Sequence, residues 1–409
     1  MRRALIVGGS LGGLFAGCML MRAGWDVLII ERTGGRLEAR GAGLGVHASM
    51  LQGLLAAGAR VDAGVGVPIA GRAVLGRDGA VVAEIAMPQL CTSWARLYTL
   101  LSDVFPEERV RRGAALVAVE QDAAGVTARL ADGSSLQADV LVAADGLRST
   151  VRAQLAPQTA FVYAGYIAWR GLAEERDFSP RTHAALFHRF AFALPEGEQM
   201  LAYPVPGEAD DVAPGRRRYN FVWYRPVEAQ RALPAMLTDA DGRVHQGGIP
   251  PQAIRPDVLG ALYRDAEALL CPAFAETVRI VEQPLFQPIG DLESPQMAFG
   301  RVALLGDAAF VARPHVAMGA IKAGQDAIAL AAALSDAPVE AALRHYDAAR
   351  RPASAALVAE SRRLGAYLEG TLGRIARDPV KLMRENGGVQ HSTVDGGLFV
   401  RLLAQAGYP

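Results

Sequence analysis

The sequence predicts an α/β fold, in which a sheet of buried parallel strands is interleaved with a second, mostly antiparallel β-sheet and followed by C-terminal helices. Three observations predict this fold. Residues 4–31 read as strand, glycine turn, helix and strand, short buried-strand patterns return at 140–144 and 302–305, and alternation rich in aromatic residues dominates from about 160 to 285. Short apolar runs are typical of parallel strands buried on both faces, whereas a period of two indicates strands with two different faces.

The first element of the fold is a βαβ unit. Residues 4–7 are a short apolar run, residues 11–22 have the length of a helix that Gly24 closes, and residues 27–30 form a second buried strand that ends at Glu31. Two parallel strands joined by a crossover helix account for this order. Residues 110–145 then look like a meander that returns to the same sheet.

The middle and the end of the chain differ in pattern from this first part. Between 160 and 285 one strand shows the alternation most clearly, with Arg217, Tyr219, Phe221, Trp223 and Arg225 alternating with Arg218, Asn220, Val222 and Tyr224. We interpret this section as the second sheet. The tail, from about 340 to 409, is helical in period but too short and too polar to form a separate domain of the usual size.

The composition excludes several classes of protein. The 409 residues are enough for two domains, and 42 basic residues balance 42 acidic ones, so no overall field attracts nucleic acid or an anionic membrane. The sparse cysteines, Cys18, Cys91 and Cys271, argue against a disulfide framework and a zinc or other metal site. The basic start breaks at once into glycines and no long apolar stretch follows, so we expect neither a signal peptide nor a membrane span, and a cytoplasmic location.

The first glycine motif, residues 8–13, follows a strand and opens a helix, which is the arrangement that binds a dinucleotide. Gly8 allows the tight turn, Gly13 lets the helix pack closely on the strand, and Ser10, in place of a second glycine, is still small enough for a pyrophosphate. Glu31, 23 residues after Gly8, is placed to bond the hydroxyls of an adenosine ribose and to repel a 2′-phosphate. The alternative is an ordinary glycine turn with Glu31 at an exposed strand end.

Two further segments resemble known sequence motifs. Residues 139–152, which contain Asp145-Gly146, and Gly306-Asp307-Ala308-Ala309 with Pro314 and Gly319 resemble the second and third motifs of the single-component, class A FAD-dependent aromatic hydroxylases, which share the p-hydroxybenzoate hydroxylase fold. The three motifs lie in the family's order and spacing, and the likeness extends from Arg3 to about Pro352. Phe310 replaces the family's usual histidine, and Arg313-Pro314-His315 and Trp169-Arg170-Gly171 look like the subgroup of 2,6-dihydroxypyridine 3-hydroxylase-type monooxygenases.

The resemblance implies non-covalent FAD and a division of the chain into a discontinuous Rossmann-like FAD-binding domain (1–72, 92–160 and 290–355), a substrate domain (73–91 and 161–289) and a helical tail (356–409). In such a fold Asp307 accepts from the ribityl hydroxyls, with a plain helix cap as the alternative. The helix that begins at Gly319 stabilises negative charge on the reduced flavin. The implied cofactor-binding residues are Gly8, Ser10, Leu11, Gly13, Glu31, Arg32, Arg40, Gly45, Val46, Asp145, Gly146, Asp307, Pro314, Gly319 and Ala320.

The resemblance also implies the reaction: NADH or NADPH, bound transiently, reduces the flavin, dioxygen adds to give a C4a-hydroperoxide, and its outer oxygen attacks a small electron-rich aromatic ring such as a hydroxypyridine or phenol. Arg148 or Arg152 could meet the nicotinamide cofactor's phosphates, or either could be a solvated surface arginine. Rival hypotheses are a flavin-dependent oxidase or dehydrogenase of the same fold and a non-catalytic flavin-binding regulator. The substrate, the preference for NADH or NADPH and the oligomeric state are left open, a homodimer included.

Four residues are expected to face the substrate. His315 is the predicted catalytic residue, because a histidine pKa near neutrality suits proton handling, and a structural turn histidine is the alternative. Arg313 could hold a substrate oxyanion or carboxylate, or it could form an ordinary salt bridge. Tyr203 and Tyr224 complete the predicted substrate pocket, although strand alternation could place either on the outer face.

Overall fold

The structure is a computed structural model, and it describes residues 1–35, 37, 43–369, 378–387, 400–402 and 404. Three sheets organise the described chain. The expected α/β fold, with a parallel sheet, a large and mostly antiparallel sheet and C-terminal helices, is confirmed. Among the described residues, no helix combines the length and the apolar surface that a bilayer crossing requires.

The first sheet has six strands in the order β16-β17-β10-β1-β2-β6. All its pairs are parallel except β16 with β17. Its central strands are almost wholly apolar because helices and the remaining sheets cover both faces. The strands are β1 (Arg3–Val7), β2 (Asp26–Glu31), β6 (Val110–Arg112), β10 (Val140–Ala143), β16 (Ala298–Phe299) and β17 (Val302–Leu304).

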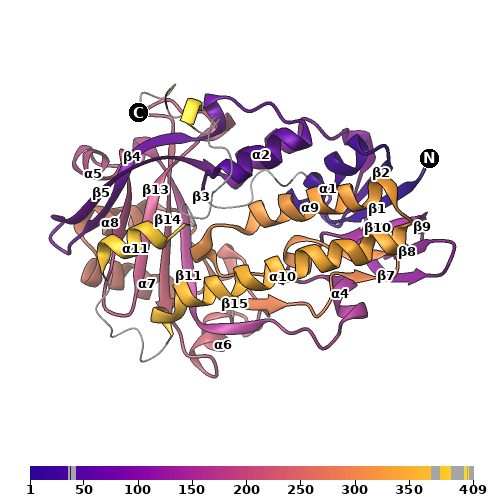
Figure 1. Cartoon of the computed structure of the whole chain (residues 1–409). Helices are drawn as coiled ribbons and strands as arrows, with labels where there is room; N and C mark the ends of the chain where they lie inside the picture. The colour runs from indigo at the N-terminus through magenta and orange to yellow at the C-terminus, as the bar shows by residue number, and fades with distance from the viewer. Residues whose placement is uncertain (36, 38–42, 370–377, 388–399, 403, 405–409) are drawn as a thin grey trace.

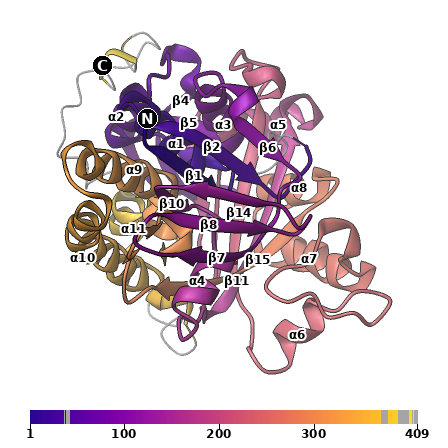
Figure 2. The same ribbon diagram turned by 90° about the vertical axis from the view of Figure 1, so that its right-hand side faces the viewer.

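Helices from both ends of the chain pack beside this sheet. α1 contacts α9 extensively, and α9 in turn contacts α2 and α10 (Figure 1). Figure 2 shows α9 and α10 together on one side of the molecule. The helices are α1 (Leu11–Arg22), α2 (Ala48–Ala57), α3 (Trp94–Ser102), α4 (Thr150–Leu155), α9 (Gly319–Asp336) and α10 (Val339–Gly365).

The large sheet has nine strands in the order β18-β15-β11-β14-β13-β12-β4-β5-β3, and only the pair of β12 with β4 is parallel. Its helices are α5 (Pro180–Leu186), α6 (Ala232–Met236), α7 (Pro256–Leu269) and α8 (Pro272–Ile280), while α11 (Pro379–Glu385) contacts β4 and β5. The strands are β3 (Gly43–Gly45), β4 (Val67–Leu75), β5 (Val81–Ser93), β11 (Val162–Glu174), β12 (Arg189–Ala193), β13 (Gln199–Val205), β14 (Arg218–Pro226), β15 (Leu285–Glu293) and β18 (Phe310–Val311).

The alternation in β14 separates two buried faces. Phe221 and Trp223 join the apolar cluster under α7 and α8, whereas Val222 and Tyr224 join a second cluster on the opposite face. Both faces are therefore internal, and the second one looks toward the parallel-sheet part of the molecule. This geometry decides where Tyr224 points, which the period of two alone left open.

The expected meander is confirmed, and after it the chain returns to the parallel sheet at β10, which pairs with β1. β7 (Leu116–Gln121), β8 (Val126–Leu130) and β9 (Ser135–Ala138) do form antiparallel pairs, but they make a separate sheet of their own. Figures 1 and 2 show this small sheet on the opposite side of β1 and β10 from α9. Its apolar side chains close the core on that face of the parallel sheet.

The division into an FAD-binding domain and a substrate domain stays a prediction. The boundary placed after residue 72 falls inside β4, and the boundary placed after residue 91 falls inside β5. Both strands belong wholly to the large sheet. The boundary placed after residue 355 falls inside α10, which continues to Gly365. A division that follows the sheets and helices would move the limit after residue 355 to the end of α10 at Gly365, and the other two limits to the ends of β4 and β5.

Candidate active site

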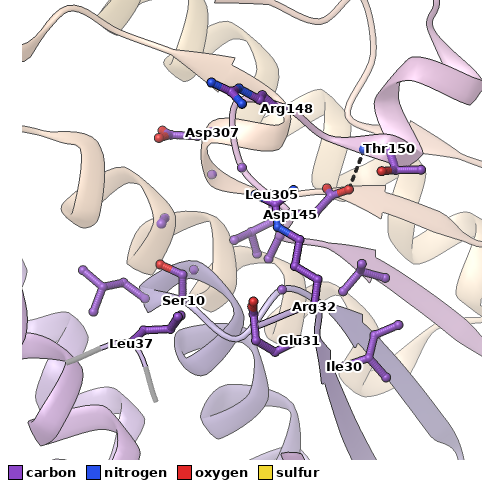
Figure 3. Close-up of a pocket in the computed structure, with 18 of the residues that line it drawn as sticks. Ser10, Ile30, Glu31, Arg32, Leu37, Asp145, Arg148, Thr150, Leu305 and Asp307 are labelled. Atoms are coloured by element: carbon purple, nitrogen blue, oxygen red, sulfur yellow. Dashed lines mark hydrogen bonds between the residues drawn. The ribbon is translucent and has the colours of Figure 1, made fainter. Parts of the chain in front are cut away.

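Two adjoining cavities lie where the parallel sheet meets the large sheet. The first, of about 460 Å³, opens at the carboxyl ends of β1, β2 and β10 (Figure 3). The second, of about 250 Å³, lies against the large sheet. Both linings include Leu44, Asp307, Gly319 and Ala320, so the two cavities meet at these residues.

The glycine turn forms one end of the first cavity. Gly8 has a φ of +104°, and a Cβ there would lie 2.5 Å from the carbonyl oxygen of Ala144. A Cβ on Gly13 would lie 1.8 Å from the carbonyl oxygen of Gly8, so Gly13 sets how closely α1 approaches β1. Gly8, Ser10 and Leu11 line the cavity, whereas Gly13 acts behind it.

The start of α1 presents its amides to this cavity. Ser10 is the N-cap, but its side chain makes no capping hydrogen bond, and no acidic residue occupies the first turn. The hydroxyl and the first amides of the helix are therefore available to an anionic group. A pyrophosphate is the natural ligand of such a helix N-terminus that follows a glycine turn.

Glu31 lies at the end of β2 and lines the same cavity, beside Arg32. Its Oε2 accepts from the backbone N–H of Gly9 and its Oε1 from that of Thr33, both at 2.8 Å. Burial raises the pKa of the Glu31 carboxyl, but the hydrogen bonds from Gly9 and Thr33, with the charge of Arg32, outweigh burial and hold the pKa below its usual value. The carboxylate is thus ionised and fixed where it could meet ribose hydroxyls.

Asp145 and Gly146 form another wall of the first cavity. Asp145 Oδ2 accepts from the N–H group of Thr150 at 2.8 Å (Figure 3) and from that of Val151 at 3.3 Å, at the start of α4. Burial raises the pKa of its carboxyl, and its Oδ1 has no hydrogen-bond partner among the described residues. Asp145 therefore braces a helix start and still offers one oxygen. Gly146 has a φ of +76°, so the turn after the strand favours glycine.

The two nearby arginines have different positions. Arg152 is buried and donates to the carbonyl oxygens of Ala308, at 2.9 Å, and Leu147, at 2.5 Å. It holds two segments of the cavity wall together and is not the surface arginine that one alternative foresaw. Arg148 is exposed and lines the first cavity, so it alone of the pair is free to meet an incoming phosphate.

Asp307 occupies the junction of the two cavities. Its side chain is open to the cavity while protein surrounds it on the other sides. Burial raises the pKa of this carboxyl above its usual value, against the opposing charge of Lys322. Gly306 before it has a φ of +62°, and its N–H donates to Asp326 Oδ2 at 3.1 Å. Asp326 also pairs with Lys322 and Arg350, so a buried ionic network holds this turn.

The N-terminus of α9 points at the same junction. Gly319 and Ala320 line both cavities, the N-cap Met318 makes no side-chain hydrogen bond, and the first turn has no acidic residue. Free amides with a positive helix dipole at this place suit the electron-rich edge of a reduced flavin. Together, the two free helix starts, the carboxylates of Glu31 and Asp307, and the connected cavities fit FAD with its ring at the junction.

The second cavity has the predicted tyrosines in its wall. Tyr203 and Tyr224 are both buried on the inner face of the large sheet, and burial raises the pKa of Tyr224 to about 12. Gly45, Val46 and Pro314 also line this cavity. Arg40, expected beside the flavin, lies outside the described residues.

His315 lines the second cavity and is 1% exposed. Its Nε2 lies 2.9 Å from the Tyr166 hydroxyl, and its Nδ1 has no partner among the described residues. The expectation of a pKa near neutrality is corrected. Burial, together with the charges of Arg313 and Arg170, lowers the pKa of His315 to about 3. The imidazole is therefore neutral at physiological pH, because the protein interior disfavours its charged form.

Arg313 is in the lining but is already paired. Its guanidinium contacts Asp291, with Nη2 2.8 Å from Oδ2 and Nε 3.1 Å from Oδ1, and it also contacts Glu369. The salt-bridge alternative thus describes this side chain in the structure. Its charge still acts on the site, because Arg313 lies 5.9 Å from the Tyr166 ring centre.

Several residues of the second cavity were not predicted. Arg170 appeared only as part of a resemblance, and Arg72 with Gln89 was not singled out. Tyr166, the hydrogen-bond partner of His315, was also missed. For Arg72 a signal existed: a lone cation inside the otherwise apolar run of residues 67–75 needs a buried acceptor or a ligand.

The chain is similar to known FAD-binding proteins. Residues 163–291 match a family model described as FAD binding domain-like, and residues 290–361 match one described as FAD binding domain. The 2,6-dihydroxypyridine 3-monooxygenase of Paenarthrobacter nicotinovorans is 32% identical over 330 residues, which cover 80% of this chain and 82% of the relative.

Solved structures share the fold over nearly the whole chain. That of 2,6-dihydroxypyridine-3-hydroxylase from Arthrobacter nicotinovorans has a TM-score of 0.85 at 28% identity and covers 92% of this chain and 94% of its own. That of Klebsiella pneumoniae HpxO, complexed with FAD and uric acid, has a TM-score of 0.72 at 22% identity and covers 99% and 96%, respectively. The chain belongs to the class A FAD-dependent aromatic hydroxylase family and is an FAD-dependent monooxygenase of aromatic or heterocyclic compounds.

Proposed function

We propose that this monooxygenase hydroxylates a small, electron-rich aromatic ring, either a hydroxypyridine or a phenol-like compound, with NADH or NADPH and dioxygen. The observation that carries the proposal is the second cavity, which is small, has aromatic and aliphatic walls and joins the cofactor cavity at Asp307 and Gly319. A flat ring needs such walls and a few placed polar groups. A relative that acts on 2,6-dihydroxypyridine supports the heteroaromatic class.

The residues that would hold FAD follow from the first cavity. The turn at Gly8 and the start of α1 would hold the pyrophosphate, Glu31 the adenosine ribose, and Asp307 the ribityl chain. The N-terminus of α9 would face the ring's electron-rich edge. When bound, FAD supplies electron transfer from the nicotinamide and the activation of dioxygen.

The protein's own part is to position the ring, exclude water and handle a proton. Tyr203 and Tyr224 supply rigid walls on the sheet face. His315 is neutral, and its Nδ1 is the ring nitrogen left for a substrate hydroxyl because Nε2 already meets Tyr166. We propose that His315 forms a hydrogen bond with that hydroxyl and is the catalytic residue that the protein supplies.

The test begins with the cofactor. Purified protein should be yellow, and acid or heat precipitation should release FAD into the supernatant. FMN, covalently held flavin or no flavin after reconstitution would contradict the proposed site. The oxidation of NADH and NADPH is then followed with a panel of hydroxypyridines and phenols.

The second measurement separates hydroxylation from its rivals. A substrate should stimulate NAD(P)H oxidation, and a hydroxylated product should form in proportion, with an oxygen atom from dioxygen. Oxidation that yields only hydrogen peroxide with every ring tested would favour an oxidase. No turnover with any of them would contradict the proposed substrate class. A cytoplasmic location and a homodimer stay predictions; the free and buried state of all three cysteines is compatible with the former.

A further inference from the structure

Arg170 brings a cation to the inner face of the large sheet. It lies on β11 opposite Val222 of β14, and Val222 lies opposite Leu201 of β13. Directly opposed residues point to the same face of a sheet. All three line the second cavity, so the guanidinium of Arg170 belongs to the substrate side of the site.

The charge of Arg170 is not neutralised by the described protein. No hydrogen bond or ion pair to its guanidinium occurs among the described residues, and its buried Nε has no partner there. Arg313, in the same lining, shows the contrast, because Asp291 and Glu369 both pair with it. Arg170 is half-buried, and a buried Nε without an acceptor is costly, so a ligand that supplies an acceptor is favoured.

Arg72 adds a second positive charge to the same cavity. It is 1% exposed, and it donates from Nε to Gln89 Oε1 at 2.8 Å and from Nη1 to the carbonyl oxygens of Met383, at 2.6 Å, and Asn386. These acceptors are neutral, and no carboxylate pairs with Arg72 among the described residues. The charges of both arginines reach Tyr203, which places them around one part of the cavity.

We infer that Arg170, with Arg72 nearby, forms an anion-binding subsite in the substrate cavity, so that the ring is recognised through a carboxylate or a ring oxyanion. This inference rests on the proposed function. The planar fork of a guanidinium matches two oxygens of a carboxylate and also binds a single oxyanion. The oxyanion-holding role expected of Arg313 is better met by Arg170, whose guanidinium has no carboxylate beside it among the described residues.

The experiment measures ligand binding to the FAD-loaded full chain by the change in the visible flavin spectrum. Three probes share one ring type. 6-Hydroxynicotinate carries a carboxylate, 2,6-dihydroxypyridine supplies a ring oxyanion, and 6-hydroxynicotinamide is a neutral counterpart of the first. The wild type should bind at least one anionic probe at least ~10-fold more tightly than the amide.

Two variants and one control locate the effect. Arg170→Met removes the charge from a side chain of similar length. It should lower the affinity for the anionic probe at least ~10-fold and change the affinity for 6-hydroxynicotinamide little. Arg170→Lys keeps the charge but loses the planar fork, so its affinity for the anionic probe should lie between those of the wild type and Arg170→Met. This variant tests the subsite if Arg170→Met does not fold. Arg218→Met is the matched control, because this arginine also lies on the large sheet but pairs with Glu174 outside the cavity.

The outcomes separate the subsite from the proposed function. If Arg170→Met loses affinity for 6-hydroxynicotinate alone, the group that the subsite binds is a carboxylate. If it loses affinity for 2,6-dihydroxypyridine alone, that group is a ring oxyanion. Equal loss for charged and neutral probes, no loss, or loss of FAD from Arg170→Met contradicts the subsite while wild-type binding still supports the substrate class. If the wild type binds none of the three probes, both the substrate class and the subsite are contradicted.

Discussion

Asp326 is fully buried on α9 and is the acceptor on which the turn before Asp307 depends. Its Oδ2 lies 2.9 Å from Lys322 Nζ and 3.1 Å from the Gly306 N–H, and its Oδ1 lies 2.8 Å from Arg350 Nε. Lys322 is 2% exposed, and its only other acceptor among the described residues is the carbonyl oxygen of Gly306. The substitution Asp326→Asn keeps the size of the side chain but leaves two cations without their carboxylate.

The loss of stability in each variant depends on which buried charged group is left without its partner. Removing one partner of a buried ion pair typically costs about 3–5 kcal/mol, so Asp326→Asn should lower the free energy of unfolding by that amount. Lys322→Met should cost less, about 1.5–3 kcal/mol, because Asp326 keeps Arg350 and the Gly306 amide. The double variant should be more stable than Asp326→Asn alone, since it removes the stranded ammonium.

Urea unfolding at saturating FAD, followed by tryptophan fluorescence, gives the three midpoints to compare. FAD affinity is measured in parallel and should fall in Asp326→Asn, because the Gly306 turn positions Asp307. The reasoning is refuted if Lys322→Met is as destabilising as Asp326→Asn, or if the two losses simply add in the double variant. Either result would show that the network does not act as a coupled unit.

Three other predictions follow from single side chains. Asp307→Ala deletes acceptors for the ribityl chain, so FAD affinity should fall at least ~10-fold in fluorescence titrations; unchanged affinity in a folded variant would count against its placement. His315→Ala should keep FAD but release hydrogen peroxide in place of product or reduce its flavin poorly, and full coupling on the true substrate would make His315 a structural residue. Burial raises the pKa of Glu175, but hydrogen bonds from Arg217 and His183 bring it down to about 2. A depressed carboxyl pKa stabilises the fold above about pH 4.5, so Glu175→Gln should cost about 3 kcal/mol at pH 6. That gap should close as the pH falls toward 2, and acid-unfolding curves that stay equally far apart would contradict the assignment.

The sequence predicted well those features that depend on neighbours along the chain. The βαβ unit with Gly8 and Glu31 occupies 29 residues from Arg3, and each part has a local reason: a turn, a helix start, a strand end. Asp307 and Gly319 were identified through the resemblance to the family's third motif, and in the structure Asp307 follows the end of β17 and Gly319 begins α9. Such features can be predicted from the sequence because the backbone geometry that they require is determined within a few residues.

What could not be predicted depends on pairs of residues that lie far apart in the sequence. Asp291 on β15 and Glu369 after α10 neutralise the charge of Arg313, and no sequence pattern around Arg313 predicts either partner. The pKa of His315 is lowered by burial that the whole fold creates. In β14 both faces are buried, so alternation could not tell whether Tyr224 or Trp223 faces the substrate cavity.

The parallel sheet joins strands from opposite ends of the chain, because β10 lies between β1 and β17. During synthesis the glycine turn leaves the ribosome early, while Leu304 follows Val7 by 297 residues. At ~5–20 residues per second, this interval lasts on the order of 15–60 s. A nascent chain that ends before Asp307 has the site for the pyrophosphate but lacks the ribityl acceptor and the amides of α9. FAD can therefore be held by its complete set of residues only after synthesis has reached the last quarter of the chain.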